Sequence, residues 1–273
     1  MTAVGAGEHD FPCGGLVHHV SVPPQCAESP CGLIVDIHGL TMNAMMQDRN
    51  TNLRALGAKH GFVVVQPSAN PAPPASSWKT GEDDQKVLAF LDDAIAAWHV
   101  DLRRVHATGF SQGGLMTWRF ACKHADRFAS FAVGASCNYP TQEACPFSGA
   151  AKPSRLVPIL YMHGKDDVIY LWQAAEAMRD AVIAAWGLSD AGVVSSDGRH
   201  ERRRWTSPQG GVFEFVWHDY RADSNVLQGH CYPGSTDPGG APGQLFSFRC
   251  DEDTAFAWGE IAMGFFLDHP MPD

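Results

Sequence analysis

The pentapeptide Gly109-Phe-Ser-Gln-Gly113 is the stretch of this chain best suited to chemistry. An apolar run leads into it and a helix-forming run follows at once, which is the strand–turn–helix context of a nucleophile elbow. Glycines on either side let a strand and a helix pass close to the serine, and a helix N-terminus favours developing negative charge. The pattern predicts that Ser111 is a nucleophile.

A serine nucleophile needs a histidine base, and the base needs an acid that orients it. When the nucleophile stands on such an elbow, the acid and then the histidine follow it along the chain, each in a loop after a strand. The loop His163-Gly-Lys-Asp-Asp167 offers Asp166 and Asp167, and the glycine-rich loop 229–234 offers His230. These residues alone leave open which aspartate is the acid.

Two backbone amides are expected to stabilise the oxyanion of an acyl-transfer reaction. One is the N–H of Gln112, directly after the nucleophile, and the other is the N–H of Leu40, in the loop after the apolar run 32–38. Loss of one such donor typically lowers kcat by about 10²–10³.

Three apolar side chains are candidates for the wall of the substrate site. Met42 follows the oxyanion turn, and Trp78 and Trp172 are expected in loops at the same edge of the sheet. Ligands of such sheets bind outside the carboxyl ends of the strands. We hypothesise that these residues bind substrate, with ordinary packing as the alternative.

Together these motifs resemble the polyhydroxybutyrate depolymerase and feruloyl esterase group of carbohydrate esterase family 1, within the α/β-hydrolases. The resemblance runs from Leu33 to the end of the chain. The family's His-Gly-x-x-Asp pattern implies that Asp167 is the acid, and its His-Gly-x strand supports the Leu40 amide. Gln228 and Tyr232 depart from the family pattern around His230. The segments that carry the resemblance are Ile37-His-Gly-Leu40, Trp78 with Asp83-Asp84, the elbow, and the loops of Asp167 and His230.

Strands and helices alternate around these motifs. Apolar runs typical of buried parallel strands occur at 32–39, 62–67, before Ser111, at 131–134 and at 157–163, and further strands are expected at 15–23, 202–207 and 212–218. Apolar residues repeat at helical spacing within 53–57, 87–98, 174–185 and 258–265. The alternation predicts an α/β-hydrolase fold with a mostly parallel central sheet, helices on both faces and no large lid domain. We expect one catalytic domain over residues 1–273.

The composition limits the class of partner. The chain has 273 residues and a formal net charge of −10, which argues against a nucleic-acid or anionic-membrane surface. No apolar run approaches the roughly 18 residues of a membrane span. No motif indicates a metal or a cofactor, and the pair His18-His19 has no third ligand at useful spacing. We expect a monomer whose partner is a small or polymeric ester.

Eight cysteines indicate the compartment. Most lie in segments that read as loops, including the N-terminal arm, and an even number in loops fits disulfides and an oxidising environment. We expect pairs Cys137–Cys145 and Cys231–Cys250, while Cys122 could equally be a small core residue. The N-terminus lacks signal-peptide features, so we expect a secreted or periplasmic protein whose leader is absent from this chain, with the cytoplasm as the alternative.

These residues predict a serine carboxylic-ester hydrolase that forms an acyl-enzyme. The resemblance implies polyhydroxyalkanoate polyesters or their oligomers, or phenolic esters such as feruloyl groups, as substrates. An acyltransferase or a serine peptidase could use the same three residues. A non-catalytic scaffold is disfavoured because the serine, aspartate and histidine are all present.

Overall fold

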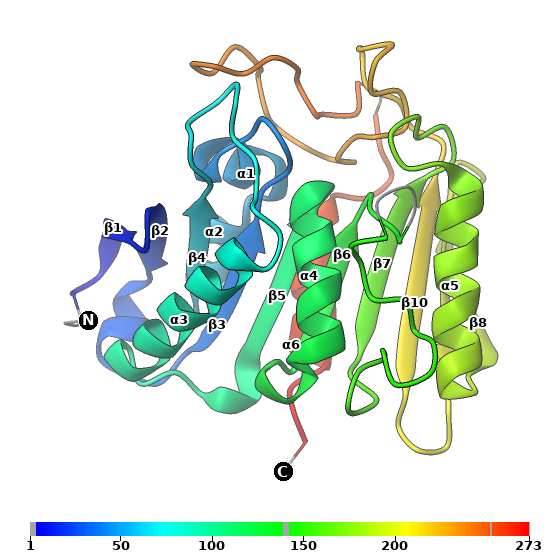
Figure 1. The fold of residues 1–273 in the computed structure, drawn as a ribbon, viewed down its shortest axis with the longest axis horizontal. Helices are drawn as coiled ribbons and strands as arrows, with labels where there is room; N and C mark the ends of the chain where they lie inside the picture. The colour runs from blue at the N-terminus through cyan, green and yellow to red at the C-terminus, as the bar shows by residue number, and fades with distance from the viewer. Residues whose placement is uncertain (1–3, 139–141, 252, 273) are drawn as a thin grey trace.

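Ten strands form one sheet in the computed structural model, which describes residues 4–138, 142–251 and 253–272. Their order across the sheet is β1-β2-β4-β3-β5-β6-β7-β10-β9-β8 (Figure 1). The strands are β1 (Gly7–Cys13), β2 (Leu16–Val22), β3 (Gly32–Ile37), β4 (Phe62–Ser68), β5 (Val105–Phe110), β6 (Ser130–Gly134), β7 (Ile159–Gly164), β8 (Ser189–Ser196), β9 (His200–Thr206) and β10 (Val212–His218).

The centre of the sheet is parallel, from β4 through β3, β5, β6 and β7 to β10. Every residue of β3, β5 and β7 is buried, which explains why these strands read as continuous rather than alternating apolar runs. The predicted α/β-hydrolase fold with a mostly parallel sheet is therefore confirmed.

Helices cover both faces of this sheet (Figure 1). Side chains of α3, α4 and α5 join the core on one face, and side chains of α1, α2 and α6 join the core on the other. The helices are α1 (Ala44–Thr51), α2 (Leu53–His60), α3 (Glu82–Ala97), α4 (Gln112–Lys123), α5 (Trp172–Trp186) and α6 (Trp258–Asp268), with short 3₁₀ turns η1 (Pro24–Ala27), η2 (Leu102–Arg104) and η3 (Ala125–Arg127).

Antiparallel strands extend the sheet at both ends. Strand β1 pairs with β2 at one end, and β9 and β8 continue from β10 at the other. The sequence pattern predicts neither β1 nor β8. The loop expected in the N-terminal arm is wrong for residues 7–13, which form β1. Both segments are polar and largely exposed, so they lack the apolar pattern that marks a buried strand.

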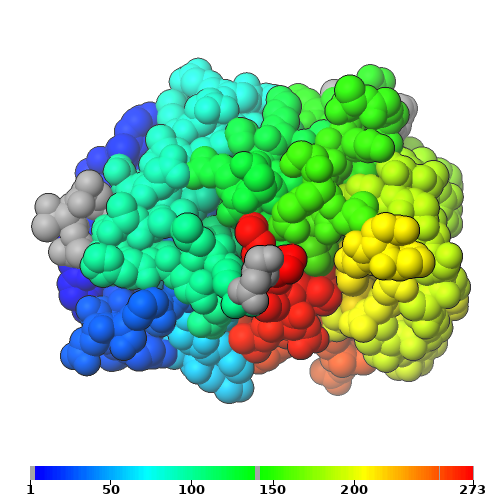
Figure 2. Space-filling model, turned by 90° about the horizontal axis from the view of Figure 1, so that it is seen from below, coloured from blue at the N-terminus to red at the C-terminus, as the bar shows by residue number. Residues whose placement is uncertain are grey.

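Irregular segments gather above the carboxyl ends of the strands. The loop 69–81 and the long segment 219–257 lie at the top of Figure 1, over the edge where β5 leads into α4. At the opposite end, Figure 2 shows the C-terminal residues between the N-terminal half and the segment of α5 to β10. Here the N–H of Met271 donates to the carbonyl of Arg103.

Three disulfides join described residues of the chain. The predicted disulfide Cys231–Cys250 is present. A further disulfide, Cys26–Cys31, closes a short turn and is not among the predicted pairs. The predicted pair Cys137–Cys145 is wrong, because Cys145 bonds to Cys122 near the end of α4, so Cys122 is not simply a core thiol. Cys137, in contrast, is buried near the end of β6.

No helix within the described ranges has both the length and the apolar character that a membrane crossing requires. The three disulfides fit an oxidising compartment.

Candidate functional site

Ser111 occupies the sharp turn between β5 and α4. Its backbone angles are φ 55° and ψ −121°, a conformation that residues other than glycine rarely adopt. A Cβ at Gly109 would lie 2.5 Å from the carbonyl oxygen of Gly113, and a Cβ at Gly113 would lie 2.1 Å from the carbonyl oxygen of Ile37. Only glycine therefore fits at either side of the serine, which accounts for the pentapeptide.

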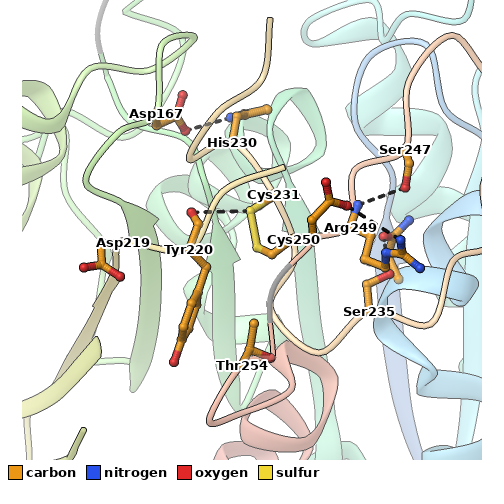
Figure 3. Close-up of a disulfide and its surroundings, with 12 residues drawn as sticks. Asp167, Asp219, Tyr220, His230, Cys231, Ser235, Ser247, Arg249, Cys250 and Thr254 are labelled. Atoms are coloured by element: carbon orange, nitrogen blue, oxygen red, sulfur yellow. Dashed lines mark hydrogen bonds and ion pairs between the residues drawn. A yellow bond between two sulfur atoms is a disulfide. The ribbon is translucent and has the colours of Figure 1, made fainter. Parts of the chain in front are cut away.

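Asp167 and His230 meet above the ends of the strands. Nδ1 of His230 lies 2.7 Å from Oδ2 of Asp167, as Figure 3 shows, and both side chains are almost fully buried. Because a carboxylate only accepts, Nδ1 carries the proton, and Nε2 is left as the acceptor that a general base needs.

The second carboxylate oxygen of Asp167, Oδ1, is also hydrogen-bonded. Oδ1 accepts hydrogen bonds from the backbone N–H groups of Ile169 and Tyr170, each at 2.8 Å. Burial alone would raise the pKa of Asp167, but His230, His163 and the Tyr170 amide together lower it below its usual value. Asp167 therefore stays ionised, and its orientation is fixed from both sides.

Asp166 has a different partner. Its carboxylate forms an exposed ion pair with the guanidinium of Arg221, in which Arg221 Nε lies 2.8 Å from Asp166 Oδ2. Of the two candidate acids, the structure thus brings Asp167, and not Asp166, to His230.

Two glycines let the acid loop and the base loop approach this closely. A Cβ at Gly164 would lie 2.1 Å from the carbonyl oxygen of Gly229, and a Cβ at Gly229 would lie 2.6 Å from the amide nitrogen of Asp167. The N–H of Gly229 donates to the carbonyl of Asp166. The glycine before His230 therefore lets the base loop pack closely against the acid loop.

His230 also packs against the residue that precedes the nucleophile. Its ring centroid lies 4.8 Å from that of Phe110, and the Phe110 ring stacks on Tyr232 at 4.0 Å. Within the described ranges no hydrogen bond joins Ser111 to His230; such bonds are commonly long before substrate binds.

The predicted oxyanion donors lie on two sides of Ser111. Gln112 is the first residue of α4, where backbone N–H groups have no partner within the helix. In the part of the chain that the structure describes, the N–H of Leu40 has no backbone partner either, and a Cβ at the adjacent Gly39 would lie 3.2 Å from the Ser111 Cβ. Both amides are therefore available near the serine.

The Gln112 side chain holds the loop 69–81 over this turn. Its Oε1 accepts from the N–H of Trp78 at 3.0 Å, and its Nε2 donates to the Ser77 hydroxyl at 3.0 Å. No pattern in the sequence indicates this second role of Gln112.

His38 and His163 are hydrogen-bonded within the fold, as expected for structural residues. His38 Nε2 accepts from the N–H of Ala69, and His163 Nε2 lies 2.7 Å from the carbonyl oxygen of Tyr170. Burial lowers the pKa of His38 to about 4 and also lowers the pKa of His163. Both imidazoles are therefore neutral at physiological pH and have little capacity to act as bases.

Two of the three candidate wall residues, Met42 and Trp78, lie deeper than a substrate wall would need. Met42 is fully buried, and Trp78 is 3% exposed with its indole N–H donated to the carbonyl of His38. Trp172 is partly buried at the start of α5, with its ring 5.7 Å from that of Phe215. Their contact with substrate stays a prediction, while Met42 and Trp78 pack against the turn at His38 and Gly39.

A buried polar network that is not predicted from the sequence joins the His230 loop to the sheet. The Tyr232 hydroxyl donates to Gln47 Oε1 at 2.6 Å, and Gln47 Nε2 donates to Asp36 at 2.6 Å. Gln66 and Thr51 also donate to Asp36. Tyr232, the departure from the family pattern, thus fastens the His230 loop to the sheet through α1. The one sign of this network in the sequence is Asp36, a single charged residue within an apolar strand.

The Cys231–Cys250 disulfide fastens the same loop on its other side (Figure 3). Next to it, the N–H of Tyr232 donates to the carbonyl of Phe248, and the N–H of Cys250 donates to the carbonyl of Tyr232. His230 is therefore positioned by a cross-linked segment rather than by a regular element.

One group of potential metal ligands occurs among the described residues, formed by His218, Cys231 and Cys250. Its two sulfur atoms are bonded to each other, so neither is a thiolate that could ligate a metal. This group does not constitute a metal site.

Comparison with protein families gives one match over the central part of the chain. Residues 70–204 match the family model described as Phospholipase/Carboxylesterase. The matched segment includes the elbow and the Asp167 loop.

Two curated relatives are similar over about half of this chain. A bifunctional acetylxylan esterase/xylanase of Neocallimastix patriciarum is 32% identical over 161 residues, which are 58% of this chain and 22% of that protein. Feruloyl esterase B of Piromyces equi is 25% identical over 146 residues, which are 51% of this chain and 27% of that protein. The chain thus spans about a quarter of the length of these relatives.

A solved structure shares the fold more completely. The acetyl xylan esterase from Aspergillus awamori aligns with a TM-score of 0.63 at 18% identity, over 78% of this chain and 94% of that one. At this level of identity the likeness concerns the fold.

Proposed function

We propose that this chain, whose residues 70–204 match the Phospholipase/Carboxylesterase family model, is a serine esterase that hydrolyses carboxylic esters. Its substrates are acetyl or feruloyl esters carried by a xylan-type polysaccharide. The names of the relatives support this class of ester. They give no support to polyhydroxyalkanoates, the other class that the motifs suggested.

The observation that carries the chemistry is the buried hydrogen bond from His230 to Asp167, with the His230 ring packed against Phe110, the residue before the elbow serine. We propose that His230 Nε2 takes the Ser111 proton as Oγ attacks the ester carbonyl carbon. The amides of Leu40 and Gln112 then donate to the oxyanion.

The tetrahedral intermediate collapses by breaking the bond to the alcohol oxygen. The protonated His230 gives its proton to this leaving group, which departs as a sugar hydroxyl and leaves an acyl-enzyme on Ser111. His230 then takes a proton from water, whose oxygen attacks the acyl carbon. Collapse of the second intermediate returns the proton to Ser111 and releases the acid.

Asp167 acts by holding His230. Its carboxylate fixes the tautomer in which Nε2 is free to accept a proton, and it stabilises the imidazolium formed in each step. The backbone N–H groups of Ile169 and Tyr170 keep the carboxylate ionised and oriented.

A panel of esters tests the substrate class. We expect release of acetate from acetylated xylan or of ferulate from methyl ferulate, with a kcat/KM at least about tenfold above that for hydroxybutyrate oligomers, a difference of about 1.4 kcal/mol in transition-state binding. Preference for the oligomers would contradict the proposal. Transfer of the acyl group to added methanol in place of water would instead indicate an acyltransferase.

We also propose that the protein works outside the cytoplasm. The disulfides near η1, α4 and His230 support an oxidising compartment. Alkylation of the native protein should modify none of these six cysteines before reduction; modification of the pairs in freshly isolated protein would contradict this location.

A further inference from the structure

We propose that a groove beside α5, lined by Trp172, Trp205 and Trp217 and here named the tryptophan groove, binds an uncharged stretch of the sugar chain whose esters the enzyme cleaves. This inference rests on the proposed function for the identity of the sugar. The groove is a cavity of about 460 Å³, separate from the hydrogen-bonded pair of His230 and Asp167.

Strand pairing builds the floor of the groove. Trp205 of β9 lies opposite Phe213 of β10, and Glu201 lies opposite Trp217. Because side chains two residues apart share a face of a strand, the β9 and β10 residues of this floor lie on one side of the sheet. Helix α5 covers that side from Trp172 onward, and β9 and β8 extend beyond β10 at the edge of the sheet.

The three indoles are only partly buried, although tryptophan is among the most buried residues on average. The Lys165 ammonium lies over the ring of Trp217, 3.3 Å from its centroid, and 6.0 Å from the ring centroid of Trp172. Within the described ranges, none of the three indole N–H groups donates a hydrogen bond to the protein. The groove thus offers fixed aromatic surface together with unused donors.

The charges of the groove balance one another. Arg203 pairs with Asp190 at 2.6 Å and with Glu201 at 2.9 Å. Arg179 lies 3.5 Å from Glu176. Lys165 adds a third cation to Arg203 and Arg179, against the carboxylates of Glu176, Asp190 and Glu201.

A site without net charge has no electrostatic preference for an ion. Its paired carboxylates still accept hydrogen bonds, and its guanidinium and ammonium groups still donate them. A sugar has hydroxyl groups that both donate and accept, and C–H faces that pack on aromatic rings. The lining therefore matches an uncharged sugar chain better than a phosphate, a uronate or a peptide whose charges all have the same sign.

The groove adjoins the proposed catalytic acid along the chain. Lys165 stands two residues before Asp167, and its N–H donates to the carbonyl of His218 at the end of β10. A sugar chain held beside Lys165 would lie next to the Asp167 loop. Such anchoring would raise the local concentration of ester groups on the same chain.

Calorimetric titration of the Ser111→Ala protein with xylohexaose, which has no ester, tests binding without turnover. We expect Trp205→Ala and Trp217→Ala, added to this background, each to weaken binding at least about tenfold, and raised salt to change it by less than about twofold. The matched control is Leu102→Ala, which removes an exposed apolar side chain in η2 and should leave binding unchanged. Circular dichroism and melting temperature identify any variant that fails to fold. If Trp205→Ala fails to fold, Trp205→Phe replaces it.

Absence of xylohexaose binding, or equal binding by all folded variants, would overturn the groove proposal. Tighter binding of an oligogalacturonate than of xylohexaose would overturn the assignment of an uncharged ligand. Failure of the proposed function would look different, because the otherwise unaltered enzyme would then release no acetate or ferulate whatever the titrations show.

A second readout uses the enzyme with Ser111 intact. The ratio of its rate on acetylated xylan to its rate on p-nitrophenyl acetate should fall at least about fivefold in Trp205→Ala or Trp217→Ala, since only the polymer can reach the groove. A ratio that stays constant in both variants would count against polymer binding there.

Discussion

Gly113, in the first turn of α4, lies directly against the carbonyl oxygen of Ile37 at the end of β3. A Cβ at this glycine would stand 2.1 Å from that oxygen, far inside the distance that atoms tolerate. The contact brings the start of α4 to the turn that carries Gly39 and Leu40. The approach of the Leu40 amide to Ser111 therefore depends on the glycine that follows the nucleophile by two residues.

Gly113→Ala should separate these two elements. We expect the free energy of unfolding to fall by at least about 2 kcal/mol, because the clash is with the backbone and no flexible side chain can move away. Gly264→Ala in α6 is the matched control: a Cβ there meets nothing within 4 Å, and alanine should stabilise the helix by about 0.5–1 kcal/mol. Urea denaturation measures both, and equal stability of the two variants would contradict the close contact.

The two neighbouring aspartates should respond differently to the same change. Asp167→Asn should lower kcat by about 10⁴, because the amide no longer fixes the His230 tautomer. Asp166→Asn loses an exposed ion pair with Arg221, which is worth about 1 kcal/mol or less, and should change kcat by less than about threefold. Steady-state kinetics on p-nitrophenyl acetate compares them, and an equal effect would remove Asp167 as the acid.

The disulfide beside His230 should matter for activity more than the disulfide before β3. The double change Cys231→Ser with Cys250→Ser removes the cross-link of the His230 loop, and we expect kcat to fall at least about tenfold because small displacements of a catalytic group are costly. The control is Cys26→Ser with Cys31→Ser, at the amino end of β3 and away from its catalytic turn. Similar kcat values for both double variants would argue against this positioning role.

Buried Asp36 should make the stability of the protein depend on pH. Burial raises the pKa of Asp36 from 3.8 to about 6, even though Gln66, Gln47 and Thr51 donate hydrogen bonds to it. The folded protein therefore holds this proton more tightly than the unfolded chain. The stability linked to this proton is present below about pH 4 and is lost as pH rises through about 6, by about 3 kcal/mol in all.

Asp36→Asn removes this titration. Urea denaturation at pH 4 and at pH 6 should show that the wild type loses about 2 kcal/mol more stability than the variant over this interval. Parallel pH dependence of the two proteins would show that the proton at Asp36 does not contribute.

The sequence predicted the central strands and the site loops because their signals are local. A continuous apolar run such as residues 32–39 indicates a strand buried on both faces, and the glycines beside Ser111 indicate the turn that they allow. Strand β8, with residues such as Ser189 and Asp190, buries too little apolar surface to show a pattern. Its position depends on pairing with β9, which no single segment reveals.

Contacts between distant segments of the chain could not be predicted from local sequence patterns. Cys145 bonds to Cys122, which lies 23 positions away on α4, so the prediction of its nearer neighbour in sequence, Cys137, is wrong. The hydrogen bond from Tyr232 to Gln47 joins residues 185 positions apart. Residue types indicated the candidate base and acid, whereas the tertiary fold distinguishes Asp167 from Asp166.

The turnover number of Ser111→Ala on p-nitrophenyl acetate tests the central claim most directly. If Ser111 is the nucleophile, kcat should fall by about 10⁵–10⁶, since removing one member of such a triad costs nearly as much as removing all of it. The folded state of the variant is checked by its melting temperature. A folded Ser111→Ala protein that retains a kcat within tenfold of the wild type would contradict the account.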